Sequence, residues 1–432
     1  MIVDRFIPDQ VVVMSTKAST PSQGPQQAIP LWKYIPLGEY SPPDEPAVEA
    51  VRKGIRGALK VFRRASPEAA VPEEELGTLP QQLLDQIVPR PGWRERVKAL
   101  GAALGPWLDI SPAESPLQVV IGAPHCENAR VLTELARARR WRIVEHPTPE
   151  QILSGGEDWV TQLDQLNSKR LVIPRLERFF LRHYDGMALI RRLFEHLHDA
   201  KCHYLIGCHS WAWAYLSITL QVESLPLPPL TLEAVDDQRL SQWLQQLARD
   251  AKRRFVFLEQ ENGRPVLPPP MDPQEGKGHN ATPPAGPVEV TGFLKHVAAH
   301  SRGNPCIAWA IWRASLQSRA GEEQNAAEDV VGFHGDVIWV KPWSALKFPA
   351  PKTKWTHPTL MMLHALLAHG GLPLPSLQRL LPFDAGKTTQ IAHLLLAANV
   401  VKEERAQWDI SRLGYPAVRQ ILNGEGYLAD SF

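Results

Sequence analysis

The sequence has little cysteine, no long apolar run and almost no net charge, and each shortage excludes a class of protein. Four Cys in 432 residues are too few for a disulfide scaffold and favour a reduced compartment. The sequence contains no run of about 18 apolar residues, so no membrane span is predicted. Residues 1–27 lack the apolar core of a secretory signal. Lys and Arg number 47 against 46 Asp and Glu, which argues against a chain-wide nucleic-acid-binding field but leaves room for a local patch. We therefore predict a cytoplasmic protein.

Proline is the outlier in the composition, with 40 residues, twice its usual share of about 5%. Pro-rich and polar stretches divide the chain, whose length predicts more than one domain. The expected parts are a disordered or extended arm (1–47), a helical segment (48–114), an α/β core (115–250), a helical lid (251–330) with a Pro/Gly-rich loop at 268–287, and a connector with a winged-helix domain (331–432).

The α/β core is predicted from apolar runs that alternate with helical stretches. Leu117–Ile121 is continuously apolar, as a strand buried on both faces would be. Trp141–Glu145, Arg170–Ile173 and His203–Gly207 follow as further short strands, with amphipathic segments between them. Strands that alternate with helices indicate a parallel sheet.

The last hundred residues carry a different pattern. Three helical stretches at 358–369, 374–381 and 385–398 precede a Val400–Ile410 segment and a final helix at Pro416–Leu422. That order is typical of a winged helix-turn-helix domain. The predicted fold class is thus α/β, with a parallel-sheet core, a helical lid and a C-terminal winged helix-turn-helix domain; the loops of that core, described next, make it resemble a P-loop NTPase.

The loop after the first predicted strand stands where a phosphate loop, G-x-x-x-x-G-K-[ST], would be. Gly122 is in register, but the second Gly, the Lys and the hydroxyl residue are replaced by Glu127, Asn128 and Ala129. The Lys that neutralises phosphate and the hydroxyl that holds Mg²⁺ are therefore missing. At about 4 Å and an effective dielectric near 20, the charge of Glu127 would repel a phosphate charge by roughly 4 kcal/mol.

The third predicted strand should end in carboxylates that hold Mg²⁺ and polarise water. Pro174 stands at the expected Asp, and Glu177 is the nearest carboxylate. Glu177 is therefore the one catalytic candidate.

The order of these elements resembles the AAA+/STAND group of P-loop NTPases, close to its origin-recognition-type members, over residues 115–425. Besides the strands already named, Tyr204–Ser210 resembles the sensor-1 strand, Leu225–Leu247 the exit into the lid, and Arg302–Pro305 a turn of that lid. The resemblance implies a degenerate nucleotide site that binds ATP or ADP weakly. It implies nucleotide contacts for Gly122, Glu127, Asn128, Ala129, His209, Ser210 and Arg302. The alternative is an unrelated α/β domain with a glycine by chance after a strand.

Three other patterns were weighed for ligand binding. Gly386-Lys387-Thr388-Thr389 lacks a preceding strand and is interpreted as a helix N-terminal region rather than a phosphate loop. Cys202 and Cys208 flank a predicted strand and would lie about 20 Å apart, too far to share one zinc ion, so no metal is predicted. The aromatic run Trp211–Tyr215 fits core packing better than a base-stacking surface.

Nucleic acid remains a candidate partner through Lys387 in the third helix of the predicted winged domain and through Lys352 and Lys354 in the Trp-containing connector before it. The leading hypothesis is an ATPase-like regulatory or scaffolding protein that acts by assembly with itself or with a protein partner, with hydrolysis lost. The alternatives are a divergent but active NTPase and a winged-helix DNA-binding factor.

Overall fold

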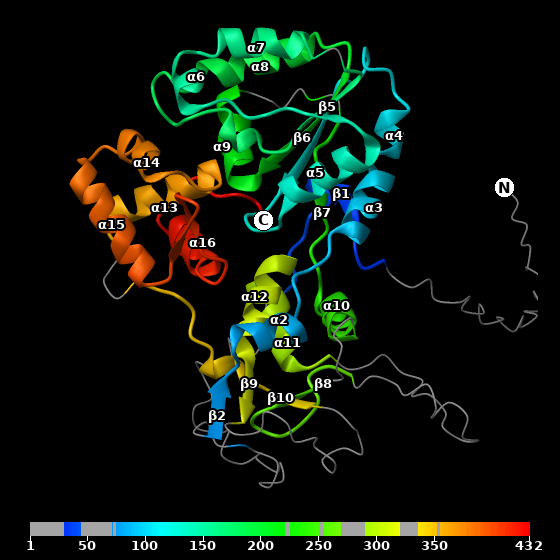
Figure 1. Ribbon diagram of the computed structural model, residues 1–432, viewed down its shortest axis with the longest axis vertical. Coiled ribbons are helices and arrows are strands. Elements are labelled where there is room, and N and C mark those ends of the chain that lie inside the picture. The colour runs from blue at the N-terminus through cyan, green and yellow to red at the C-terminus, as the bar shows by residue number, and fades with distance from the viewer. Residues whose placement is uncertain are drawn as a thin grey trace, which may run out of the picture. The chain divides into compact units, whose positions relative to one another are not determined.

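The computed structural model describes residues 30–44, 71, 75–166, 168–220, 225, 227–249, 255–268, 290–319, 336–351 and 355–432 (Figure 1). Most of the predicted arm, residues 48–64 of the predicted helical segment, the 268–287 loop except its first residue, Lys352 and Lys354 lie outside these residues. Within the part of the chain that is described, no helix is long and apolar enough to cross a membrane.

The centre of the fold is a six-stranded sheet in the order β1-β7-β3-β6-β5-β4. Its members are β1 (Tyr34–Pro36), β3 (Leu117–Gly122), β4 (Arg142–Ile143), β5 (Arg170–Ile173), β6 (His203–His209) and β7 (Leu230–Leu232). The strands from β7 to β4 are parallel, and β1 pairs with β7 in the antiparallel sense. Because β3 lies between β6 and β7, all six of its residues are buried, which confirms the prediction from its apolar run.

Helices connect and cover the sheet. They are α3 (Arg94–Ala103), α4 (Gly105–Leu108), α5 (Asn128–Arg139), α6 (Pro149–Leu153), α7 (Glu157–Asp164), α8 (Ala188–His198) and α9 (Ser210–Leu220). Helix α2 (Gln81–Ile87) lies away from this sheet, where Arg313 donates to the Leu84 carbonyl at 3.2 Å. Both α5 and α9 pack against β3 and β6. Trp211 and Trp213 on α9 are buried, so this part of the aromatic run packs in the core.

The predicted helical lid needs correction. It contains α11 (Gly292–His300) and α12 (Pro305–Ser315), whereas α10 (Asp237–Arg249) lies just before its expected start, and it also shares a second sheet. That sheet has the order β2-β9-β10-β8, from β2 (Leu76–Thr78), β8 (Phe255–Glu259), β9 (Leu316–Arg319) and β10 (Asp336–Val340). The parallel pairing of β8 with β10 joins segments on either side of the expected boundary at 330. Nothing local in the sequence reports such a pairing.

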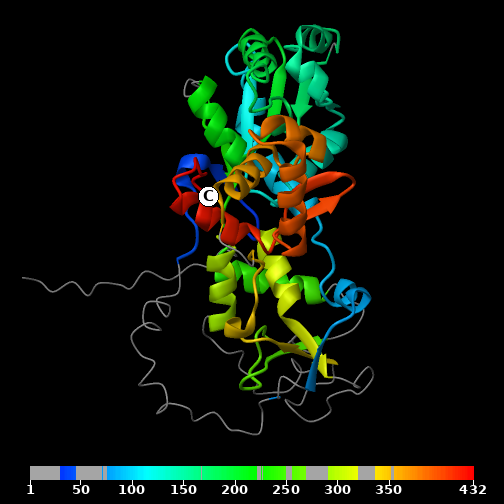
Figure 2. The same cartoon turned by 90° about the vertical axis from the view of Figure 1, so that its left-hand side faces the viewer.

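The C-terminal region follows the predicted order. It consists of α13 (His357–His369), α14 (Leu374–Leu380), α15 (Ala385–Ala397), β11 (Val401–Glu404), β12 (Gln407–Ile410) and α16 (Tyr415–Gly424). Asp384 caps α15 by accepting a hydrogen bond of 2.8 Å from the Lys387 N–H, so the Gly-Lys-Thr-Thr run is a helix N-terminus, as predicted. Figure 2 shows this region beside the central sheet, where α13 packs against α9.

Candidate functional site at the carboxyl edge of the central sheet

Ligand sites in open parallel sheets lie outside the carboxyl ends of the strands. At this edge, which we call the carboxyl edge, the structure brings together the ends of β3, β5 and β6. Gly122 and His209 are register partners across β3 and β6. The residues Glu127, Asn128, Ala129, Glu177 and Ser210 follow directly from these strands, so most of the predicted site residues share one edge.

The loop after β3 is folded onto its own side chains. A Cβ placed on Gly122 would lie 2.4 Å from Cys126 Sγ and 2.7 Å from Asn128 Cβ, so glycine is required there. The Asn128 amide is 5% exposed and donates a 2.9 Å hydrogen bond back to the Val120 carbonyl. Asn128 therefore holds the loop closed instead of replacing the phosphate-binding lysine.

Two donors from other elements bind the backbone carbonyls of this loop. Arg96 on α3 donates through Nη2 to the Cys126 carbonyl at 2.7 Å, and Asn304 donates to the Pro124 carbonyl at 2.7 Å. Asn304 also caps α12, so one amide links the lid to the loop. These contacts support a loop conformation that turns carbonyls toward protein donors, whereas a phosphate needs N–H groups.

The carboxylate of Glu127 is neutralised from the C-terminal region. Its Oε1 lies 2.7 Å from Arg412 Nη2, and the two side chains are 29% and 30% exposed. The Arg412 guanidinium also lies 5.7 Å from the ring centre of Trp309 on α12. Arg412 thus contacts the loop and the lid together.

Glu177 is a buried carboxylate that already accepts hydrogen bonds at both oxygens. Its side chain is 1% exposed, and its oxygens accept hydrogen bonds from Arg175 Nε at 2.9 Å and the His209 N–H at 3.3 Å. Burial alone would raise the pKa of this carboxyl, but the neighbouring His209 and the charge and hydrogen bond of Arg175 lower it below its usual value. A carboxylate with both oxygens occupied and a low pKa is poorly suited to act as a general base.

The end of α13 covers this part of the edge. The Gly370 carbonyl accepts hydrogen bonds from Arg175 Nη2 at 2.8 Å and Arg178 Nη2 at 2.9 Å. Arg178 also donates through Nη1 to Gln407 at 3.1 Å. Gly370 has a φ of 58° as the C-cap of α13, and its Cα position faces His209. Sequence reasoning missed Arg175, Arg178 and Gly370, although a Gly-Gly pair after a helical stretch is a recognisable end signal.

Ser210 is bound by a residue near the C-terminus, and Arg302 by a residue near the other end of the chain. The Ser210 hydroxyl donates to the buried Asp430 carboxylate, which also binds Arg419 Nε at 3.2 Å. Arg302 lies in the turn before α12, where its carbonyl accepts from the Tyr40 hydroxyl at 2.8 Å. Burial lowers the pKa of Arg302, and its charged neighbours are Arg419 and Asp430.

The predicted nucleic-acid contacts are only partly within the described residues. Lys387 is exposed on α15 and lies 5.6 Å from the Phe383 ring, whereas Lys352 and Lys354 fall outside. Among the residues the structure describes, no three or more His, Cys, Asp or Glu side chains are placed to hold a metal.

Comparison of the chain with protein-family models and with curated proteins finds no match. The assignment of function therefore rests on the geometry. The loop after β3 does not fit the phosphates of a nucleotide, because its own side chains fill it and a glutamate–arginine pair stands at its end.

Proposed function

We propose that the protein is an ATPase-like regulatory or scaffolding protein of the AAA+/STAND type, with a degenerate nucleotide site, that acts through protein assembly. The observation that carries the proposal is the ion pair between Glu127 and Arg412. The pair places an internal anion in the loop after β3, where a phosphate loop would bind phosphate. It also attaches the C-terminal region to that loop. The core is thereby held together without a nucleotide.

The order of the parallel strands and the helix–strand order of the C-terminal region support this assignment. The loop contacts of Asn128, Arg96 and Asn304 support a structural role for the former phosphate loop. Pro174 at the end of β5 and the occupied oxygens of Glu177 support the loss of hydrolysis.

The outward face of α15 supports a protein partner over nucleic acid. Lys387, Gln390 and His393 are exposed along this helix, and Leu394 beside them is 63% exposed. One full positive charge is too little for strong phosphate binding, so we assign this face, with Leu394 on it, to a protein partner.

ATP turnover and binding test the nucleotide part of the proposal. The full chain with Mg²⁺ should hydrolyse ATP no faster than a protein-free control, and calorimetry should give a Kd of about 1 mM or weaker. The triple variant Glu127→Gly, Asn128→Lys and Ala129→Thr should bind ATP more tightly, because it restores the turn, the cation and the metal ligand. Turnover above about 0.1 per second that Glu177→Gln abolishes would establish the divergent NTPase instead.

Two variants on one helix separate assembly from DNA binding. Leu394→Lys should weaken self-association, measured by sedimentation, or binding of a protein partner, whereas Lys387→Gln should leave it unchanged. Salt-dependent binding of a DNA duplex that Lys387→Gln reduces would favour the DNA-binding factor.

A further inference from the structure

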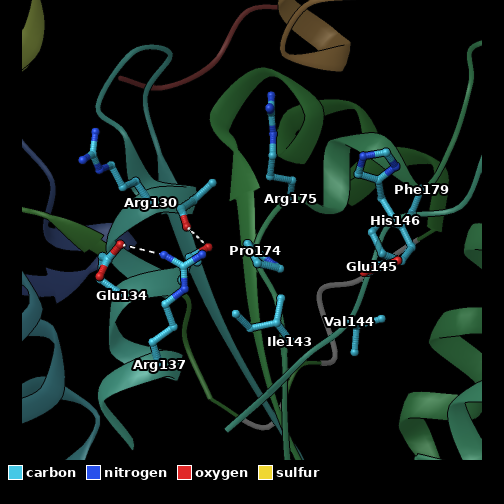
Figure 3. A pocket seen from close by; sticks show the side chains of 12 residues that line it. Arg130, Glu134, Arg137, Ile143, Val144, Glu145, His146, Pro174, Arg175 and Phe179 are labelled. Atoms are coloured by element: carbon cyan, nitrogen blue, oxygen red, sulfur yellow. Dashed lines mark hydrogen bonds and ion pairs between the residues drawn. The ribbon is translucent and has the colours of Figure 1, made fainter. Parts of the chain in front are cut away.

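A second feature of the carboxyl edge is a hollow of about 650 Å³ between α5 and the ends of β4 and β5, shown in Figure 3. This volume falls in the range of about 300–1,000 Å³ that is usual for small-molecule sites. Neither Glu127 nor Arg412 lines the hollow, so it is distinct from the filled loop and goes beyond the proposed function. We call it the edge hollow.

The floor of the edge hollow is apolar and comes from three segments. It consists of Ile143 and Val144 on and after β4, Pro174 after β5, and Phe179 after the short turn of helix Leu176–Arg178. Val144 and Phe179 are buried. These atoms are anchored by the sheet, since the Val144 N–H donates to the Val172 carbonyl at 2.8 Å. Such a floor is preformed for the flat face of an apolar group.

Pro174 has a specific consequence here. A carboxylate at this position would place a charge on the floor, as in the metal-binding strand that the sequence analysis expected. Proline instead contributes an apolar ring next to Ile143 (Figure 3), so the residue that stands in place of a metal ligand adds to the apolar floor.

The rim of the hollow is polar, and only some of its charged side chains form ion pairs. Glu134 and Arg137 on α5 neutralise each other at 3.0 Å. Arg130, one turn closer to the helix N-terminus, stacks at 5.3 Å on the Trp93 ring, and the ion pairs among the described residues do not include it. Arg175 uses Nε for Glu177 and Nη2 for Gly370, which leaves Nη1 as a donor. Glu145 on the opposite rim is exposed to water.

We propose that the edge hollow binds a small organic anion with a flat apolar body. The body packs on the apolar floor, and the anionic group lies at the rim, which Arg130 on α5 and Arg175 after β5 both line and where their charges neutralise it. The Thr133 hydroxyl already donates to the Ala129 carbonyl at 2.8 Å. Its oxygen can therefore only accept a hydrogen bond, and it adds no donor for the anion. Guanidinium groups are suited to carboxylates, sulfonates and phosphates because they donate in a planar fork.

The test uses naphthalene-2-carboxylate as the probe and its neutral carboxamide as the matched ligand, each titrated into the full chain by calorimetry. The carboxylate should bind at submillimolar concentration, and the carboxamide at least five-fold more weakly. Arg130→Gln should weaken the carboxylate at least three-fold without changing the carboxamide. Arg191→Gln is the control, because Arg191 is an exposed cation on α8 outside the lining of the hollow.

A filling variant tests the location. Thr133→Trp places an indole in the hollow and should abolish binding of both ligands. If the filled variant folds, as judged by circular dichroism, and binds the carboxylate like the parent, the proposal is overturned. Because Arg130→Gln changes an exposed side chain, it keeps the test decisive where the filled variant does not fold. Equal affinity for carboxylate and carboxamide, or an equal effect of Arg191→Gln, would also overturn the proposal.

Discussion

Replacing Glu177 by Gln tests whether this carboxylate is a structural anion or a catalytic group. Glu177 accepts hydrogen bonds at both oxygens, from Arg175 Nε and from the His209 N–H. A Gln amide offers one acceptor oxygen and one NH₂ group. Whichever way it is turned, one N–H donor faces another donor, so the isosteric variant loses one hydrogen bond as well as the charge.

The magnitude follows from these contacts. A unit charge pair at 2.9 Å is attracted by roughly 6 kcal/mol at an effective dielectric of 20. Arg175 is 37% exposed, so screening and the recovered desolvation of Glu177 reduce the net loss. We expect Glu177→Gln to lower the free energy of unfolding by about 3 kcal/mol, since breaking a buried pair costs about 3–5 kcal/mol.

The assay is thermal unfolding followed by circular dichroism. At about 2.1 cal/mol/K per residue over the roughly 300 residues that the structure describes, a loss of 3 kcal/mol corresponds to a Tm lower by about 5 °C. The control is Glu150→Gln, because Glu150 is 73% exposed and lies 3.9 Å from Arg379; its Tm should stay within about 1 °C. A Glu177→Gln protein as stable as this control would refute the structural account.

Three further perturbations test the contacts between the C-terminal region and the carboxyl edge. A double-mutant cycle of Glu127→Gln and Arg412→Gln, measured by denaturant unfolding, should give a coupling of about 1 kcal/mol, because both side chains are partly exposed; additive losses would mean that the pair is not formed. Burial lowers the pKa of His364 to about 4 and of His369 to about 3. Below about pH 6.5 these histidines are therefore protonated in the unfolded chain but still neutral in the folded one. The histidine contribution to stability is therefore complete above that pH and should fall between pH 6.5 and 4 by up to about 3 kcal/mol per pH unit. The double variant His364→Gln with His369→Gln should flatten a plot of Tm against pH, and an unchanged slope would contradict the low pKa values. Gly370→Ala places a methyl group 2.9 Å from the His209 ring at a φ of 58° and should lower the free energy of unfolding by at least about 1 kcal/mol, which Gly424→Ala, with open space around it, should not do.

Local patterns in the sequence predicted most of the helices and the strands of the central sheet. Helix α5 (Asn128–Arg139) lies in the amphipathic segment predicted between the first two strands, because a 3.6-residue apolar period is a signal that acts within a few residues. The three helices α13, α14 and α15 also begin and end within one residue of their predictions. The sequence alone was likewise enough to see that the loop after β3 lacks the second Gly, the Lys and the hydroxyl of a phosphate loop.

The second sheet was beyond this kind of reasoning. Strand β8 pairs with β10 and β9 with β2, and the partners lie far apart in the chain. Strand pairing of this kind is decided by which strand edges meet when the helices pack. A two-residue apolar period in one segment therefore does not indicate which other strand it pairs with.

The state of the candidate site was decided by the tertiary structure. Glu127 was predicted to repel a phosphate, and that remains a prediction; its pairing with Arg412, 285 residues later, had no signal in the sequence. Glu177 was a catalytic candidate because it is the nearest carboxylate to Pro174, but only the fold surrounds it with Arg175 and His209. Residue type and local spacing determine which groups can carry charge, whereas burial and the partners that neutralise a charge depend on distances through space, which the chain sets only once it is folded.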